Sequence, residues 1–183
     1  YSFAQNPNTR VLDEPFYAHY LRRADVKVAH PGSAEILEAL PNTKQEVLAL
    51  ISGVSKTNKY VFIKGMAHHY LTKKPDYILS CSNMILIRNP EKLLSSFAKV
   101  IENPTIDDIG IKKAAEIFTY LKARGKTPIV IDSDELLKNP TAYLEKICKL
   151  LHIPFSNAMM SWQEGGIEED GVWAQYWYAN VHQ

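Results

Sequence analysis

Four short apolar runs, with helical patterns between them, constrain the fold of this chain more than any other feature. Each run is nearly continuous in apolar residues and does not alternate with polar ones, which is typical of strands covered on both faces. Strands separated by helices pair in parallel, because the helix carries the chain back across the sheet. We therefore predict a three-layer α/β fold with a mostly parallel sheet, whose strands are Thr9–Asp13, Tyr60–Lys64, Met84–Arg88 and Pro128–Asp132.

The segments between these runs carry apolar residues at helical spacing. Proline stands at a first-turn position in two of them, and Arg124-Gly125 closes another in the manner of a C-cap. The predicted helices are Pro15–Ala24, Ser33–Leu40, Lys44–Val54, Pro90–Ile101, Ile111–Ala123 and Asp134–Leu151. No repeat or long linker interrupts them, so residues 1–183 are predicted to form a single domain. The last 20 residues are predicted to form a loop over its body.

Composition narrows the range of partners. The chain has 21 basic and 20 acidic residues, and this balance gives no electrostatic basis for binding nucleic acid or an acidic membrane surface. No run of about 18 apolar residues and no signal peptide is visible. Cys81 and Cys148 belong to no cluster with metal-ligand spacing, so we predict two free buried thiols, no metal site and a reducing, cytoplasmic location.

The most informative motif follows the third predicted strand. Arg88 ends the strand, Pro90 opens a helix, and Ser96 comes eight residues after Arg88. A helix N-terminus offers unpaired N–H groups and a positive dipole end, and an arginine adds a fork of donors that suits a phosphate. The motif therefore indicates a phosphate site. The alternative is an arginine in a surface ion pair and a serine on a solvated helix face.

This motif resembles the 3′-phosphate-binding segment of sulfotransferases, enzymes with a fold like that of the P-loop nucleoside triphosphate hydrolases. They transfer a sulfuryl group from PAPS (3′-phosphoadenosine 5′-phosphosulfate). Val130–Phe155 also resembles the late strand–helix segment of this family. Other stretches resemble a bacterial-type branch of the family, some of whose members carry a branched-chain aminotransferase label: Tyr1–Gln5, Val11–Tyr17 and Gly171–Val181. The resemblance covers essentially the whole chain, and the chain contains no recognisable site for an aminotransferase cofactor.

The resemblance implies roles for four residues at the cofactor. Arg88 and Ser96 would hold the 3′-phosphate, and Ser133 and Trp173 would complete the cofactor-binding set. Ser133 stands where the family usually has a tyrosine near the adenine. The family also has a 5′-phosphosulfate loop, whose backbone N–H groups cradle the anion, and this loop is expected upstream of Tyr1. The fragment alone is therefore expected to be inactive even if the full-length protein is an enzyme.

Two groups are candidates for the chemistry. Glu14 follows the first predicted strand and resembles the glutamate that serves as base in several bacterial and Golgi-type sulfotransferases. Asp13 is a second choice, and either carboxylate could instead cap the next helix. Lys64, His68 and His69 follow the second strand, where cytosolic sulfotransferases carry a Lys-Thr-His run with a histidine base. Here His68 stands four residues after the lysine and not two, so the resemblance does not select one base. Glu14, His68 and His69 all remain candidates, and Lys64 is expected to stabilise charge.

Three functions follow from these residues. The first is sulfuryl transfer from PAPS to a hydroxyl or amine of a small-molecule acceptor. The second is an ATP-dependent phosphotransferase. Two strands end in Lys64 and Arg88 and not in an evident metal-binding aspartate, which disfavours this function. Asp13 and Asp132, at the ends of the other two strands, leave it open. The third is a noncatalytic nucleotide-binding module on the same fold. Neither the acceptor nor the oligomeric state can be predicted from the sequence.

Overall fold

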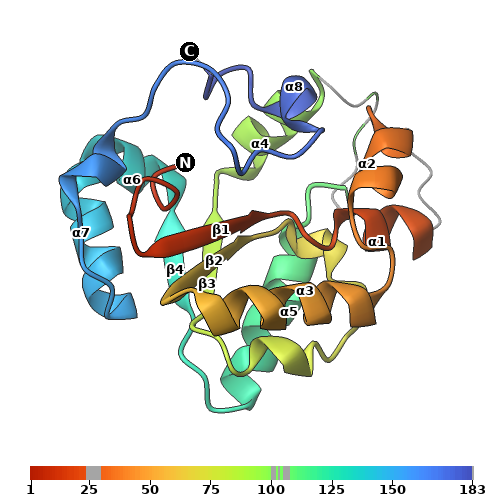
Figure 1. The fold of residues 1–183 in the computed structure, drawn as a ribbon, viewed down its shortest axis with the longest axis horizontal. Coiled ribbons are helices and arrows are strands. Elements are labelled where there is room, and N and C mark those ends of the chain that lie inside the picture. Colours follow the sequence, from red (N-terminus) through yellow and green to blue (C-terminus); the bar gives the residue numbers. More distant parts are fainter. Residues whose placement is uncertain (24–29, 100–101, 103, 105–107, 183) are drawn as a thin grey trace.

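The computed structural model describes residues 1–23, 30–99, 102, 104 and 108–182 (Figure 1). Residues 1–8 form consecutive turns. The strands and longer helices that follow are β1 (Thr9–Asp13), α1 (Tyr17–Arg23), α2 (Ser33–Ala39), α3 (Lys44–Thr57), β2 (Tyr60–Lys64), β3 (Met84–Ile87), α4 (Pro90–Phe97), α5 (Ile111–Ala123), β4 (Ile129–Asp132), α6 (Ser133–Lys138), α7 (Pro140–Leu151) and α8 (Ala174–Trp177). Short 3₁₀ turns are η1 (Ala67–His69), η2 (Asp76–Ile78) and η3 (Asn157–Met160). The predicted α/β class and its parallel strands are confirmed. The predicted helix residues Ala24, Val100 and Ile101 lie outside the described residues.

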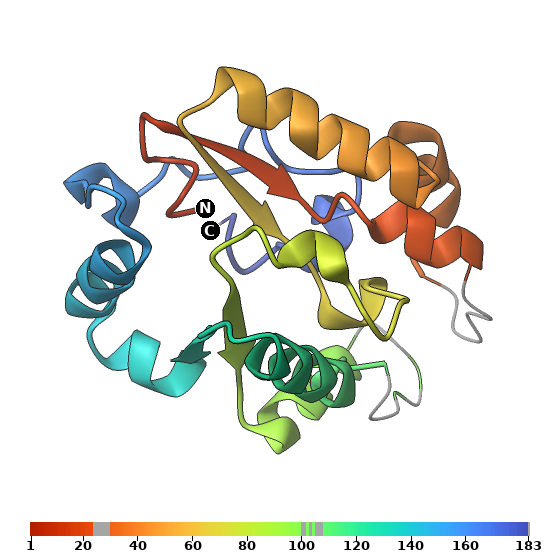
Figure 2. The same ribbon diagram turned by 90° about the horizontal axis from the view of Figure 1, so that it is seen from below.

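The strands pair in parallel, as predicted, but as two pairs. β1 pairs with β2, placing Asp13 opposite Lys64, and β3 pairs with β4, placing Ile87 opposite Asp132. Within the described residues these are two two-stranded sheets and not one continuous sheet. Helix α3 lies along the β1–β2 pair and α5 lies beside β3, as Figure 2 shows from below. In each pair the carboxyl ends of both strands meet at one edge.

The prediction that every strand is covered on both faces is wrong for the second pair. The side chains of Leu86 and Ile87 in β3 and of Val130 in β4 are exposed to 62%, 45% and 44%. Ile131, which alternates with Val130, is buried. The described helices therefore cover one side of β4, because adjacent residues of a strand point to opposite faces.

The predicted helix Asp134–Leu151 is two helices, α6 and α7. Asn139 accepts a hydrogen bond from the Ala142 backbone N–H through its side chain, and Pro140 occupies the first turn of α7. Proline fits a first turn because its missing N–H has no partner there in any helix. The Asn-Pro pair therefore ends one helix and starts the next.

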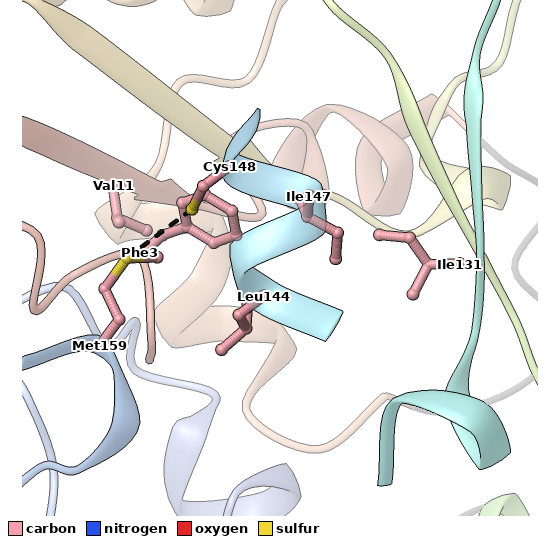
Figure 3. Packing of buried hydrophobic residues seen from close by; sticks show 7 residues of the cluster. All are labelled: Phe3, Val11, Ile131, Leu144, Ile147, Cys148 and Met159. Carbon is pink, nitrogen blue, oxygen red and sulfur yellow. Dashed lines mark hydrogen bonds between the residues drawn. The ribbon is translucent and has the colours of Figure 1, made fainter. Parts of the chain in front are cut away.

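The main hydrophobic core joins the two strand pairs through α7. Figure 3 shows Cys148 of α7 pointing toward Phe3 and Val11, and Ile147 pointing toward Ile131 of β4. The Cys148 and Met159 sulfur atoms lie 3.9 Å apart. Cys148 is buried as predicted, whereas Cys81 is exposed, so the prediction of a second buried thiol is wrong. Helix α7 thus fixes the position of β4 relative to β1.

A second buried cluster lies around α1 and α2. It comprises Tyr17, Ala18, Ile36 and Trp173, the last of which comes from the C-terminal segment. This segment includes α8 and returns toward the N-terminus (Figure 1). There the hydroxyl of Tyr1 donates to Asp170 at 2.5 Å, and the His182 ring nitrogen lies 2.7 Å from the same hydroxyl. The C-terminal segment is therefore packed on the domain. It was predicted to be a loop, whereas the structure contains the short helix α8 within it.

No helix in the described ranges has the combination of length and apolar character that a membrane crossing requires.

Candidate active site

The ends of β1 and β2 bring three charged side chains together. Because Asp13 pairs in register with Lys64, the next residue, Glu14, lies over the same edge. The Lys64 ammonium forms an ion pair with Glu14 Oε1 and lies 3.4 Å from Asp13 Oδ1. Both carboxylates thus face the lysine. The alternative role of these residues as side-chain caps of the following helix has no support in these contacts.

Glu14 has an unusual backbone as well as an unusual environment. Its φ angle is 43°, in the left-handed region that residues other than glycine seldom adopt. Its N–H donates to the Lys64 carbonyl at 2.8 Å, and its carbonyl accepts from the Tyr17 N–H at 2.9 Å. Such strained conformations persist where the surrounding structure holds them, often at functional sites. Here the turn directs a buried carboxylate, 6% exposed, toward the end of β2.

Two side chains of the C-terminal segment complete this cluster. The Trp173 indole N–H donates to Asp13 Oδ2 at 3.0 Å, and the Tyr178 hydroxyl donates to the same oxygen at 2.7 Å. The Lys64 ammonium donates to the Tyr178 oxygen at 2.7 Å. Sequence reasoning assigned Trp173 to the cofactor, but in this structure its ring is buried and its one polar atom binds Asp13. The hydrogen bond from Tyr178 to Asp13 was not predicted, because no local pattern links two residues that are 165 positions apart.

The two predicted histidines lie beside Glu14 in the short turn η1. His69 is 1% exposed, and its Nδ1 lies 3.7 Å from Glu14 Oε2, beyond hydrogen-bond distance. Its ring stacks on Tyr17 and Tyr20, at centroid distances of 4.6 and 4.8 Å. His68 packs edge-on against His69, and the Nδ1 atoms of both histidines are buried without a hydrogen-bond partner in the described residues. Glu14, Lys64 and His69 therefore form one cluster, with His68 behind it.

Burial controls the protonation of these groups. It raises the pKa of Glu14 above its usual value, while the positive charge of Lys64 opposes this rise. Burial, followed by the charge of the nearby His30, lowers the pKa of His68 to about 4. Burial also lowers the pKa of His69, with His68 as the next cause. Both imidazoles are consequently neutral at pH 7.

The predicted phosphate-binding residues lie on other elements. Arg88 directly follows β3, and Ser96 lies on α4; both are exposed. Asn89 accepts hydrogen bonds from the backbone N–H groups of Glu91 and Lys92, so it already satisfies two donors of the α4 N-terminus. Among the described residues, Arg88 has no ion pair and no hydrogen bond links it to the Glu14 cluster. Its guanidinium is left available for an anion.

Ser133 begins α6, directly after β4. Its hydroxyl oxygen is buried without a hydrogen-bond partner among the described residues. An unsatisfied buried hydroxyl is costly, so a ligand oxygen at this position would be stabilised. Within the same residues, no three side chains of the His, Cys, Asp or Glu type gather as a metal site.

The structure thus combines a parallel α/β fold with an acid, a lysine and histidines at the ends of β1 and β2, and with an arginine after β3 that has no ion pair among the described residues. The chain belongs to the sulfotransferase domain family, which matches residues 1–183. The computed structure is similar to the crystal structure of a sulfotransferase from Alicyclobacillus acidocaldarius, with a TM-score of 0.60 and 15% identity. That match covers 89% of this chain and 79% of the other, and it confirms the predicted fold type.

Two Arabidopsis thaliana proteins are also similar to this chain. Branched-chain-amino-acid aminotransferase-like proteins 1 and 2 are each 37% identical to it over its whole length. The chain spans about a third of the length of these relatives, 33% and 32%. Their names agree with the label expected for this branch, and the residues of this chain that match them are the same residues that match the sulfotransferase family model.

Proposed function

We propose that this domain transfers a sulfuryl group from PAPS to a hydroxyl or amine of a small-molecule acceptor. The observation that carries the proposal is Glu14: a buried carboxylate of raised pKa, held by Lys64 at the strand ends of a sulfotransferase domain. When bound, PAPS supplies the activated sulfuryl group. What the protein must add is orientation, a base for the acceptor and positive charge near the leaving phosphate.

Glu14 is the base in this proposal. Its Oε2 faces His69 and accepts no hydrogen bond in the described structure, whereas Oε1 is held by Lys64. Asp13 is a poorer choice, because Trp173 and Tyr178 already donate to it. The histidines are poorer choices as well, because burial lowers their pKa values. Glu14 therefore takes the acceptor proton, and Lys64 offsets negative charge beside it.

The cofactor set fits a phosphorylated nucleoside. Arg88 has an exposed, unpaired guanidinium among the described residues, and Ser133 has a buried hydroxyl that lacks a partner. We place the 3′-phosphate at Arg88 and Ser96, as the sequence resemblance implies. The 5′-phosphosulfate grip is proposed to lie upstream of Tyr1.

Binding of adenosine 3′,5′-bisphosphate to the full-length protein, measured by calorimetry, tests the cofactor. Arg88→Ala is expected to weaken binding about 10- to 150-fold, the equivalent of about 1.5–3 kcal/mol for a hydrogen bond to a charged group. Arg124→Ala, which removes another exposed arginine, is the matched control and should leave affinity unchanged. Equal affinity for AMP and the bisphosphate would refute PAPS as the cofactor. Competition by ATP with Mg²⁺ would favour the phosphotransferase.

Turnover of PAPS with a panel of phenols, alcohols and amines tests the chemistry. Glu14→Gln is expected to lower turnover about 10²- to 10⁴-fold, because it removes the general base. Its affinity for the bisphosphate should not change, since Glu14 does not hold the nucleotide. His68→Ala is the comparison, and it is expected to lower turnover less than Glu14→Gln does. Unchanged turnover in Glu14→Gln would assign the base elsewhere, and tight bisphosphate binding without any turnover would indicate a noncatalytic module.

A further inference from the structure

The hydroxyl of Tyr178 is the meeting point of the candidate active site. Besides its hydrogen bonds with Asp13 and Lys64, it accepts from the Trp173 indole N–H at 3.3 Å and lies 3.4 Å from Glu14 Oε1. A phenolic hydroxyl has one proton to donate and can accept from other groups. The Tyr178 oxygen thus has four polar neighbours and a single proton for two carboxylates.

Distance decides which carboxylate receives that proton. Asp13 Oδ2 lies 2.7 Å from the Tyr178 oxygen, whereas Glu14 Oε1 lies 3.4 Å away. Hydrogen bonds between oxygens are strongest near 2.7–2.8 Å, so the proton points to Asp13. Lys64 and Trp173 then approach from the accepting side. Tyr178 burial, followed by the charges of Glu14 and Asp13, raises its pKa, so the phenol keeps its proton at neutral pH.

The consequence is a division of labour between two adjacent carboxylates. Asp13 is held by two fixed donors, from Tyr178 and Trp173, and its distance to Lys64 is 3.4 Å. Glu14 has the closer contact with the Lys64 ammonium. If Asp13 lost one of these donors, its negative charge would attract the Lys64 ammonium more strongly. The ion pair between Lys64 and Glu14 would then weaken, and Lys64 is the only positive side chain beside Glu14 among the described residues.

We propose that Tyr178 is a positioning residue of the sulfuryl transfer: by holding Asp13, it leaves the Lys64 ammonium to pair with Glu14. The inference rests on the proposed function only for the role of Glu14 as base. The titratable groups that face Glu14 come from every neighbouring element: Asp13 of β1, Tyr17 of α1, Lys64 of β2, His69 of η1, Tyr70 and Tyr178. Of these, Lys64 carries the positive charge at pH 7.

The test is the titration of the Glu14 carboxyl in the Tyr178→Phe variant, followed by carbon-13 NMR and assigned with Glu14→Gln. Losing part of an ion pair raises a carboxyl pKa, so the Glu14 midpoint is expected to rise by about one pH unit. Where turnover is measurable, the acidic limb of its pH profile should move by the same amount. Tyr176→Phe is the matched control, because this tyrosine is 38% exposed and outside the cluster. An unchanged Glu14 titration would overturn the proposal.

A double-mutant comparison tests the route of the effect. If the hydroxyl acts by holding Asp13, Tyr178→Phe should shift the Glu14 titration little in the Asp13→Asn background. An equal shift in both backgrounds would show direct action on Glu14 and would overturn the proposal. Should Tyr178→Phe fail to fold, Trp173→Phe removes the other donor to Asp13 and is expected to shift the midpoint in the same direction. The titration needs neither cofactor nor acceptor, so its failure is distinguishable from a failure to bind the bisphosphate.

Discussion

Gly171 provides a sharp test of how the C-terminal segment reaches the candidate site. A Cβ atom at this position would lie 2.1, 2.2 and 2.3 Å from the Cη2, Cζ2 and Cζ3 atoms of the Trp173 ring. Ordinary carbon contacts are about 3.5–4.0 Å, so the ring would have to move. Trp173 is 1% exposed and donates to Asp13. Gly171→Ala therefore forces the indole away from its carboxylate.

The expected destabilisation has two parts. Overpacking a filled site costs about 1–3 kcal/mol. Losing a hydrogen bond to a charged group costs about 1.5–3 kcal/mol. Since movement of the ring relieves part of the overlap, we expect about 3 kcal/mol in total. With a urea slope of about 2 kcal/mol per molar, the midpoint of unfolding should fall by about 1.5 M.

Urea denaturation followed by far-ultraviolet circular dichroism measures this midpoint. Gly53→Ala is the control, because a Cβ atom at Gly53 in α3 would have no neighbour within 4 Å. It is expected to stabilise the protein by about 1 kcal/mol, the difference between glycine and alanine inside a helix. A Gly171→Ala midpoint equal to that of the wild type would refute the reasoning, as would a shift of the same sign in both variants.

Two further predictions concern the core and the buried histidines. Ile147→Ala should lower the free energy of unfolding by about 2–5 kcal/mol, because it opens a cavity between α7 and β4. Leu150→Ala on the same helix removes a side chain that is 53% exposed and should change stability by less than about 0.5 kcal/mol, so equal losses in urea denaturation would contradict this packing. The folded-state pKa values of His68 and His69 are lowered, so the stability that they contribute is present above pH 6.5 and is lost as pH falls toward 4. Between pH 7 and pH 5 the free energy of unfolding should fall less steeply in His68→Asn than in the wild type, by up to about 1.4 kcal/mol per pH unit. An equal slope in the two proteins would contradict the burial of His68 in its neutral form.

The elements of this fold were largely predictable because their signals are local. The bounds of β1 and β2 agree with their apolar runs, and Pro90 begins α4 as expected. The Asn139-Pro140 pair is a local signal for a break, but the apolar periodicity continues on both sides of it, so a single helix was predicted. The division of the strands into two pairs, and the exposure of Leu86, were not predictable, because an apolar run does not reveal what covers it.

The residues of the candidate site likewise fall into those that the sequence predicted and those that it did not. Glu14, Lys64 and His69 were found from their places after strand ends, since parallel strands bring their carboxyl ends to one edge. The contact of Tyr178 with Asp13 was not predicted, because it depends on where a distant segment packs. The roles of Arg88 and Ser96 stay predictions. Their exposed positions suit a phosphate, and the bisphosphate experiment tests them.

The site draws its members from opposite ends of the domain, and this has a consequence for folding during synthesis. Tyr178 and Asp13 are separated by 165 residues, so the ribosome must release almost the whole domain before they can meet. Until then Asp13, Glu14 and Lys64 lack the donors of the C-terminal segment. Non-local contacts of this kind form late and slowly. Formation of the Asp13–Tyr178 contact and completion of the fold are therefore expected to coincide, so a nascent or partly folded chain lacks the complete cluster.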